Sequence, residues 1–291
     1  MKILTNKIMA ASAAILVLGL VFTGCGNGVS LLLTTEKNEG IVYAGSMADH
    51  KYGYGIGEDG HATYTEDGGR TWQVSGNKAA PLFSLSAIND RVCFATGEHK
   101  AFLKTDDGGR TWKSLKGHLG KRSKGCSFRN EEFGTVWTSG NAFEYSAAND
   151  DWTAIGNPKG CGLIESVYAM APGKFFLCGS NGTIYSTNDY GKNWEECQKI
   201  FDKEDEIKPV TGQWIKTSEF DFRNNVLRFA YLAEQNYVYS MIIWKSLDEG
   251  KTWTKESVTK LPNLAKALAI NCNGGISIFN TDSTMNYYVM K

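Results

Sequence analysis

The sequence predicts an all-β fold, a six-bladed β-propeller with four antiparallel strands in each blade. Two observations lead to this prediction. An eight-residue pattern recurs four times, and its copies are embedded in the same order of short apolar runs and glycine-containing turns. The repeat of about 40 to 45 residues matches one propeller blade.

The recurring pattern, called the box below, reads Ser/Thr-x-Asp-x-Gly-x-Thr/Asn-Trp. Its copies span Thr65–Trp72, Thr105–Trp112, Thr187–Trp194 and Ser246–Trp253. Each copy contributes an aspartate, a glycine and a tryptophan: Asp67, Gly69, Trp72, Asp107, Gly109, Trp112, Asp189, Gly191, Trp194, Asp248, Gly250 and Trp253. Glycine permits the positive backbone angle that tight turns need.

Upstream of each box, an apolar run, a turn and an alternating segment predict two strands, and a short strand follows the tryptophan. A further apolar run precedes these units, at Leu82–Ala87, Cys126–Arg129 and Leu163–Met170. Each repeat therefore has four strands.

Two irregularities affect the count of blades. Tyr145–Trp152 is a degraded box, in which Ala147 replaces the aspartate and Asn149 replaces the glycine. Asparagine is the best substitute for glycine in a left-handed turn, so we expect this blade to persist with part of its turn chemistry lost. The long interval between Asp189 and Asp248 predicts either an insertion in the fifth blade or a hidden extra blade. Six blades are expected, and seven are the alternative.

The carboxyl-terminal segments Leu268–Cys272, Ile276–Phe279 and Met285–Met290 form only three strands. We expect Ser30–Thr35 to supply the missing outer strand. Closing the ring with strands from both ends of the chain removes open sheet edges.

The first residues are predicted to be a targeting segment. Lys2 and Lys7 precede an uncharged run over Ile8–Thr23, which is short for a spanning helix and suits a signal peptide. The ending Phe22-Thr23-Gly24-Cys25 resembles the bacterial lipobox. That resemblance implies removal of residues 1–24, lipidation of Cys25, a linker over residues 25–29 and one propeller domain over residues 30–291, held at the extracytoplasmic side of a bacterial envelope membrane. An ordinary signal peptide or an uncleaved anchor are the alternatives.

Charge and cysteine content indicate which partners, disulfides and metal sites to expect. The full chain has a formal charge of +0, and removal of residues 1–24 leaves 29 basic and 31 acidic residues, a charge of −2. Such a balance argues against a nucleic-acid partner. Six cysteines besides Cys25 permit three disulfides, but Cys93 and Cys178 lie in apolar runs, which favours buried thiols. No zinc-ligand spacing occurs, so neither a metal nor a cofactor is expected.

The boxes resemble the Asp-box, or bacterial neuraminidase, repeats of many β-propellers. The resemblance implies that each box forms the turn between the third and fourth strands, that its aspartate accepts backbone N–H bonds and that its tryptophan packs beneath. Calcium ligation is disfavoured because each box offers too few oxygen ligands. If the boxes mark one face as scaffold, we expect binding loops on the other, including the connections Leu115–Gly125 and Lys199–Lys208.

Three functions compete. A sialidase needs an arginine triad, a tyrosine and acidic residues, but the Arg-Ile-Pro signature of that family is absent. The spacing between Gly179 and Trp194 is similar to the photosystem II assembly-factor-like propellers, which implies a protein that holds protein partners without chemistry. Glycan binding through Trp137, Trp214 or Trp244 is the third possibility, with inter-blade packing as its alternative. We predict a non-catalytic, monomeric envelope lipoprotein that binds a protein or a cell-envelope glycan. The candidate binding residues are Arg129, Glu165, Trp214, Glu219, Arg223 and Arg228.

Overall fold

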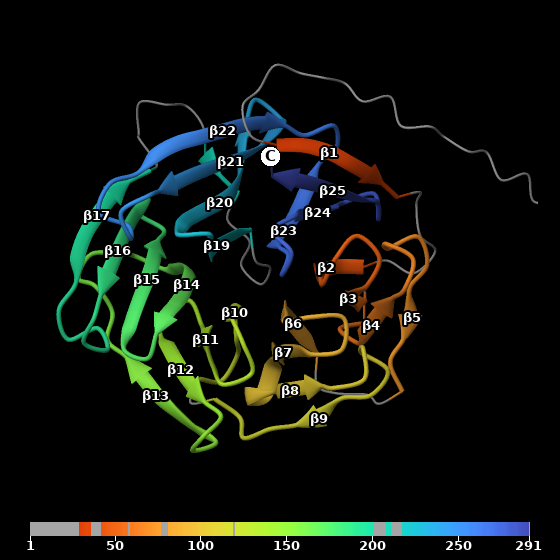
Figure 1. Cartoon of the computed structure of the whole chain (residues 1–291), viewed down its shortest axis with the longest axis horizontal. Helices are drawn as coiled ribbons and strands as arrows, with labels where there is room; N and C mark the ends of the chain where they lie inside the picture. The colour runs from red at the N-terminus through yellow and green to blue at the C-terminus, as the bar shows by residue number, and fades with distance from the viewer. Residues whose placement is uncertain are drawn as a thin grey trace, which may run out of the picture.

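The computed structural model describes residues 29–35, 42–57, 59–76, 81–118, 120–200, 208–210 and 217–290. Six antiparallel sheets stand around a central axis, with the first strand of each nearest the centre (Figure 1). The six-bladed prediction is confirmed, and the seven-bladed alternative is wrong.

The first blade contains β2 (Val42–Met47), β3 (Gly53–Gly57), β4 (Ala62–Thr65) and β5 (Gln73–Val74). The second contains β6 (Leu82–Ala87), β7 (Cys93–Gly97), β8 (Phe102–Thr105) and β9 (Lys113–Ser114), with a 3-10 turn, η1 (Glu98–Lys100), between β7 and β8. The third contains β10 (Gly125–Phe128), β11 (Phe133–Trp137), β12 (Ala142–Ser146) and β13 (Asp151–Ile155).

The fourth blade contains β14 (Ile164–Ala171), β15 (Lys174–Gly179), β16 (Thr183–Thr187) and β17 (Glu195–Lys199). The fifth contains β18 (Lys208–Pro209), β19 (Ser218–Arg223), β20 (Val226–Gln235), β21 (Val238–Ser246) and β22 (Thr254–Lys260). The sixth contains β23 (Ala265–Ile270), β24 (Ile276–Asn280), β25 (Met285–Met290) and β1 (Val29–Thr34).

The ring is closed by the amino-terminal strand, as expected. β1 pairs antiparallel with β25, with Val29 opposite Met290 and Thr34 opposite Asn286 (Figure 1). Thr35 extends the pairing, since its N–H donates to the carbonyl oxygen of Met285 over 2.9 Å. The last blade is therefore completed by the start of the domain.

The long interval before the fourth box is an insertion in the fifth blade. Its described part includes β18, whose Lys208 and Pro209 pair with Glu234 and Ala233 near the end of β20. β19 pairs with the other end of β20, so one long strand accommodates both. The inserted residues extend an existing sheet.

The hydrophobic core is divided among the spaces between neighbouring blades. Between the second and third blades, Phe94 stacks on Phe128 with ring centroids 4.1 Å apart, and Tyr145 and Trp152 pack against Phe102. Comparable clusters join the other pairs of neighbours. Blade-to-blade packing therefore replaces a single central core.

The two faces of the ring differ in which turns they carry. In an antiparallel blade, the turn between the first and second strands lies at the same end as the turn between the third and fourth strands. Backbone hydrogen bonds link these turns directly, from Gly68 N to Lys51 O over 2.7 Å and from Gly108 N to Arg91 O over 2.9 Å. We call this end the box face. The opposite face carries the turns between second and third strands and the connections between blades.

Within the described residues, no helix has the length and apolar character needed to cross a membrane. The expected signal segment, the lipidation residue Cys25 and Trp214 lie outside the described residues.

Candidate functional site

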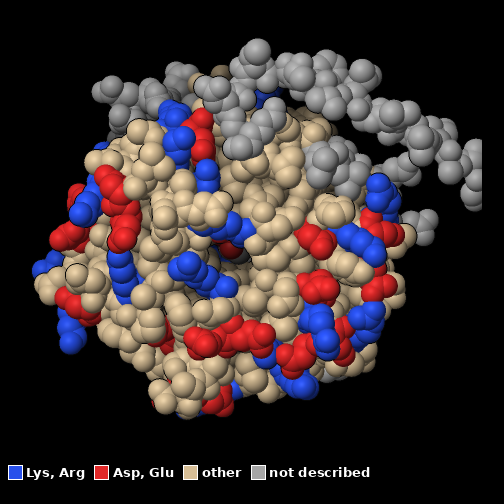
Figure 2. All heavy atoms as spheres, viewed as in Figure 1, with Lys and Arg blue, Asp and Glu red and all other residues tan. Residues whose placement is uncertain are grey.

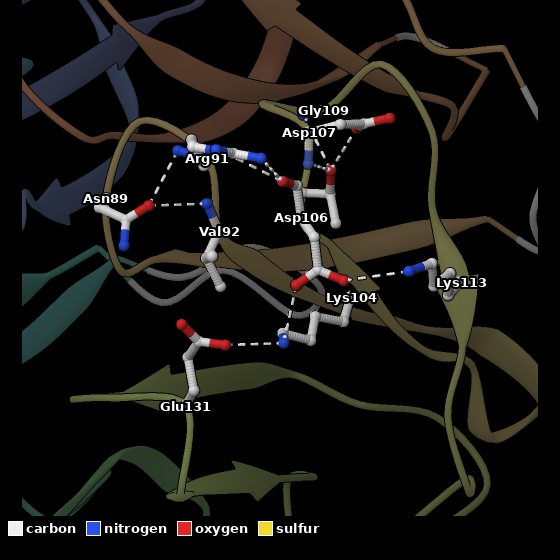
Figure 3. A network of polar contacts seen from close by, with 10 residues as sticks. Asn89, Arg91, Val92, Lys104, Asp106, Asp107, Gly109, Lys113 and Glu131 are labelled. Atoms are coloured by element: carbon white, nitrogen blue, oxygen red, sulfur yellow. Dashed lines mark hydrogen bonds and ion pairs between the residues drawn. The ribbon is translucent and has the colours of Figure 1, made fainter.

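The box turns are held by hydrogen bonds that use up their carboxylates. Asp107 accepts through Oδ1 from Thr111 N and from Thr105 Oγ1, each over 2.9 Å, and through Oδ2 from Thr111 Oγ1 over 2.6 Å. The hydroxyl of Thr105 in turn accepts from Gly109 N over 2.9 Å (Figure 3). The same set of bonds recurs in the other three boxes.

These bonds stabilise the ionised carboxylate. The backbone and side chain of Asn193 lower the pKa of Asp189 to about 2, and Thr252 does the same for Asp248. With both oxygens engaged by N–H and O–H donors, the box aspartates act as turn locks.

The box glycines are also interface residues. Gly109 has φ +88°, and a Cβ added to it would stand 2.9 Å from Cβ of Tyr64 in the preceding blade. Gly191 has φ +76°, and its added Cβ would meet the carbonyl oxygen of Gly156 at 2.2 Å. Both the backbone angle and the neighbouring blade therefore require glycine.

Two of the box tryptophans join neighbouring blades by hydrogen bonds as well as by packing, whereas Trp253 Nε1 donates within its own turn to Gly250 O. Trp112 Nε1 donates to Ser75 Oγ over 3.2 Å, and Trp194 Nε1 donates to Gly156 O over 2.8 Å. The degraded box keeps this link, because Trp152 Nε1 donates to Lys116 O over 2.8 Å.

The degraded box differs from expectation in its turn. Asn149 does not take the left-handed position; Asp150 does, with φ 44°. The reason is a tighter hairpin, since Ser146 pairs with Asp151 and leaves a turn of only residues 147–150. The side chain of Asp150 accepts from Tyr145 Oη over 2.9 Å and replaces part of the lost turn lock.

A second set of turn locks was missed at the sequence level. In the turns between first and second strands, the side chains of Asp49, Asn89 and Asn130 each accept two backbone N–H bonds. Asn89, for example, accepts from Arg91 N and Val92 N over 2.8 and 2.9 Å (Figure 3). An Asp or Asn that ends an apolar run two or three residues before the donors is a recognisable Asx-turn signal.

The central pocket lies on the box face and not on the opposite face, where binding is expected, and that expectation stays a prediction. A pocket of 240 Å³ opens at the centre of the ring among the ends of β6, β10, β19 and β23, which all finish at the box face. Figure 2 shows basic side chains beside a hollow at this centre. The pocket is lined by Ser86, Ala87, Ile88, Ser127, Phe128, Arg129, Tyr168, Glu219, Phe220, Asp221, Phe222, Arg223, Ile270 and Cys272.

Arg223 is fixed in the wall of this central pocket. Its Nε donates to Asp221 Oδ1 over 2.8 Å, and its two Nη atoms donate to the carbonyl oxygens of Asn271 and Cys272. These bonds tie the fifth blade to the sixth. Each of the three guanidinium nitrogens is thus engaged in a hydrogen bond, and Arg223 belongs to the scaffold of the pocket.

Arg129, by contrast, is exposed and has no carboxylate partner among the described residues. Its guanidinium lies over the ring of Phe222, 5.3 Å from the centroid, and one Nη donates to Met170 O over 3.4 Å. A planar fork held by stacking on an aromatic ring has most of its donors available for a ligand.

The remaining polar groups of the pocket are mostly engaged or buried. Glu219 Oε2 accepts from Ile270 N over 2.7 Å. Burial raises the pKa of Asp221, whose Oδ2 has no hydrogen-bond partner among the described residues, and raises that of Tyr168 to about 12. Burial also raises the pKa of the Cys272 thiol to about 11, so this thiol stays protonated at neutral pH.

Two candidate residues lie elsewhere. Glu165 forms a buried ion pair with Lys124, with 2.5 Å between Oε2 and Nζ, near the starts of β14 and β10 and so toward the opposite face. Arg228 lies on β20 and pairs with Glu256 of the outer strand β22 through Nε at 2.8 Å. The structure therefore unites Arg129, Glu219 and Arg223, and separates Glu165 and Arg228 from them.

Neither Trp137 nor Trp244, the two described tryptophans proposed for glycan stacking, lines the pocket. Trp137 is fully buried in the cluster between the third and fourth blades, and Trp244 is half-buried against the cluster between the fourth and fifth. Both serve inter-blade packing. All six cysteines in the described residues are free thiols, with Cys93 and Cys178 buried as expected.

Comparison with known proteins supports the architecture. No family model and no curated protein matches the sequence. The structure of YCF48 bound to a D1 peptide is similar, with a TM-score of 0.51 at 16% identity, over 90% of this chain and 96% of that chain. YCF48 from Cyanidioschyzon merolae has a TM-score of 0.53 at 15% identity, over 90% of this chain and 98% of that one. The WD40 repeats of RRP9 reach 0.59 at 8% identity, over 91% and 98%. At these identities the likeness establishes the β-propeller fold.

Proposed function

We propose that this protein is a non-catalytic binding protein of the cell envelope, whose central pocket on the box face holds a carboxylate-bearing segment of a protein partner. In this proposal the repeats belong to the Asp-box class, and the mature chain is a monomeric lipoprotein anchored through Cys25. The observation that carries it is Arg129, the pocket cation without a carboxylate partner among the described residues.

The chemistry of the pocket favours a carboxylate ligand. Arg223 already engages Oδ1 of Asp221, whereas Arg129 forms no ion pair with a described carboxylate, so an incoming acid can bind Arg129. Arginine binds carboxylates through two parallel N–H bonds. Phe128 and Phe222 give the pocket apolar walls that suit the aliphatic part of a peptide side chain.

The similar YCF48 structure supports a peptide as the ligand class, because that propeller was determined with a D1 peptide bound. The pocket of 240 Å³ is small for a drug-sized molecule, and it suits one or two side chains of a longer segment.

The experiment is capture of the partner by the full-length, membrane-extracted protein, comparing the wild type with Arg129→Ala and with Arg70→Ala. Arg70 is exposed on the box face and, within the described part of the chain, donates only to the carbonyl of Asp67 in its own turn, so its variant is the matched control. Loss of one charge-assisted hydrogen-bonded contact is expected to weaken binding about 10- to 100-fold.

The expected result is a partner retained by the wild type and Arg70→Ala and lost with Arg129→Ala. A captured set that is the same for all three proteins contradicts the proposal.

A glycoside hydrolase is the second candidate, favoured by two carboxylates on one strand. Glu219 and Asp221 both line the pocket and lie two positions apart on β19, about 7 Å along the strand. Burial raises the pKa of Asp221, as a general acid requires. Against it, Tyr168 is buried and its raised pKa makes it a poor nucleophile. Hydrolysis of envelope glycans or sialosides that disappears in Asp221→Asn would establish this alternative in place of binding.

A further inference from the structure

We infer that the central pocket opens toward the membrane, so that its occupant is an extramembrane segment of a membrane protein close to where that segment leaves the bilayer. The inference rests on the proposed lipid anchor at Cys25. It follows from the direction in which the amino-terminal strand enters the ring.

The entry point of β1 is fixed by its pairing. β24 leads through a turn at residues 281–284 into β25, and this turn joins a second to a third strand, so it lies on the opposite face. β25 then runs toward the box face and reaches Met290. Because Val29 pairs with Met290 in an antiparallel ladder, β1 begins at the box face.

The anchor is close to this point in the chain. Cys25 precedes Val29 by four residues, which span at most about 15 Å when fully extended. The two ends of β25 are separated by about 17 Å. The linker is therefore too short to carry a lipid on Cys25 past the opposite face, and it reaches the bilayer when the box face is turned to the membrane surface.

The pocket opens on the same face, so anchoring through Cys25 also turns the mouth of the pocket toward the membrane. Arg129, Phe222 and the ends of the inner strands would face the narrow space between the ring and the bilayer. A soluble envelope protein has poor access to this space, whereas a loop or terminus of an integral membrane protein emerges within it. This geometry selects the membrane protein as partner.

The fifth blade offers two matched probe positions at the ends of one strand. Leu247 follows β21 in the box and is 71% exposed, and Tyr237 precedes β21 on the opposite face and is 89% exposed. Ten residues of extended chain place them about 33 Å apart. Each is changed to cysteine for a fluorescent donor, in a chain where the half-buried Cys197 and Cys272 are replaced by serine.

The test is energy transfer to acceptor-labelled lipid, with the lipidated full-length protein in vesicles of phosphatidylethanolamine and phosphatidylglycerol. We expect stronger transfer from Leu247→Cys than from Tyr237→Cys. Inserting a flexible linker of about 20 Gly/Ser residues before Val29, with a mean reach of about 25 Å, should remove the difference. Equal or reversed transfer with the native linker overturns the orientation.

Floating of the labelled proteins with the vesicles separates the two ideas. If the protein with Cys25 floats, the Cys25→Ser variant does not float, and energy transfer is nevertheless reversed, then the lipid anchor stands and only the orientation is refuted. Protein that does not float refutes both. For the partner, a photo-reactive residue at position 222 is expected to cross-link to integral membrane proteins, and adducts only with soluble envelope proteins overturn that choice.

Discussion

The requirement for glycine in the boxes can be tested with three Gly→Ala variants that differ in one physical term each. Gly191 has φ +76°, and its added Cβ would lie 2.2 Å from the carbonyl oxygen and 2.7 Å from the nitrogen of Gly156. Gly160 has the same φ of +76° with no atom within 4 Å of the added Cβ. Gly140 has neither a positive φ nor a neighbour.

The magnitudes follow from these geometries. Alanine in the left-handed region costs about 1 to 2 kcal/mol, partly offset by a gain of about 0.4 to 1 kcal/mol from the stiffer unfolded chain. Gly160→Ala should therefore lower the free energy of unfolding by about 1 kcal/mol, and Gly140→Ala should change it by less than about 0.5 kcal/mol. Gly191→Ala adds an overpacking cost of about 1 to 3 kcal/mol. Gly156 cannot retreat easily, because its N–H donates to Tyr190 O over 3.0 Å.

The assay is urea unfolding followed by tryptophan fluorescence, with midpoints compared at a common m-value. The predicted order of loss is Gly191→Ala, about 2 to 4 kcal/mol, then Gly160→Ala, then Gly140→Ala. If Gly191→Ala costs no more than Gly160→Ala, the box glycine does not act at the blade interface, and only its backbone angle matters.

Three further predictions concern single side chains. Tyr237 has φ 62° in an exposed hairpin turn, so Tyr237→Gly should raise the free energy of unfolding by about 0.5 to 1 kcal/mol, measured by urea unfolding; a loss would refute strain at that turn. Burial lowers the pKa of His118 from 6.5 to about 4, so the unfolded chain binds a proton first as the pH falls, and up to about 3 kcal/mol of stability should be lost between pH 6.5 and 4. His118→Asn, which keeps an acceptor for Gly120 N, should remove this fall in the free energy of unfolding with pH, whereas His50→Asn at an exposed site should leave it unchanged. An equal pH dependence in the wild type and both variants would contradict the prediction. Trp152→Phe should cost about 1 kcal/mol in thermal or urea unfolding through loss of its hydrogen bond to the preceding blade, and an unchanged stability would show that packing alone holds it there.

Much of the fold could be predicted because the same local sequence pattern, apolar runs around a box, recurs from blade to blade. The box residues specify a turn by hydrogen bonds within eight residues, and the apolar runs on either side give the strands. Ring closure by Ser30–Thr35 followed from counting strands. The tight turn at Asp150 escaped prediction, because alignment to the box placed Asn149 in the left-handed position without the extra pairing of Ser146 with Asp151.

The site could be predicted less well because its residues come from five blades. Sequence pattern alone identified Arg129, Glu219 and Arg223 as candidates, and the structure brings them to one pocket. It could not show that all three guanidinium nitrogens of Arg223 are engaged by Asp221 and two carbonyl groups, while Arg129 has no carboxylate partner among the described residues. The antiparallel order of strands places the ends of the inner strands, and with them this pocket, beside the boxes and away from the face where binding loops are expected.

The central claim is that Arg129 binds a carboxylate of the partner in the pocket. A double-mutant cycle tests it most directly, with Arg129→Ala on this protein and replacement of the bound acidic residue by its amide on the captured partner segment. The account predicts a coupling free energy of at least about 1 kcal/mol, so that the second change has little further effect once the first is made. Additive losses, with a coupling near zero, would show that Arg129 does not contact that carboxylate and would contradict the account.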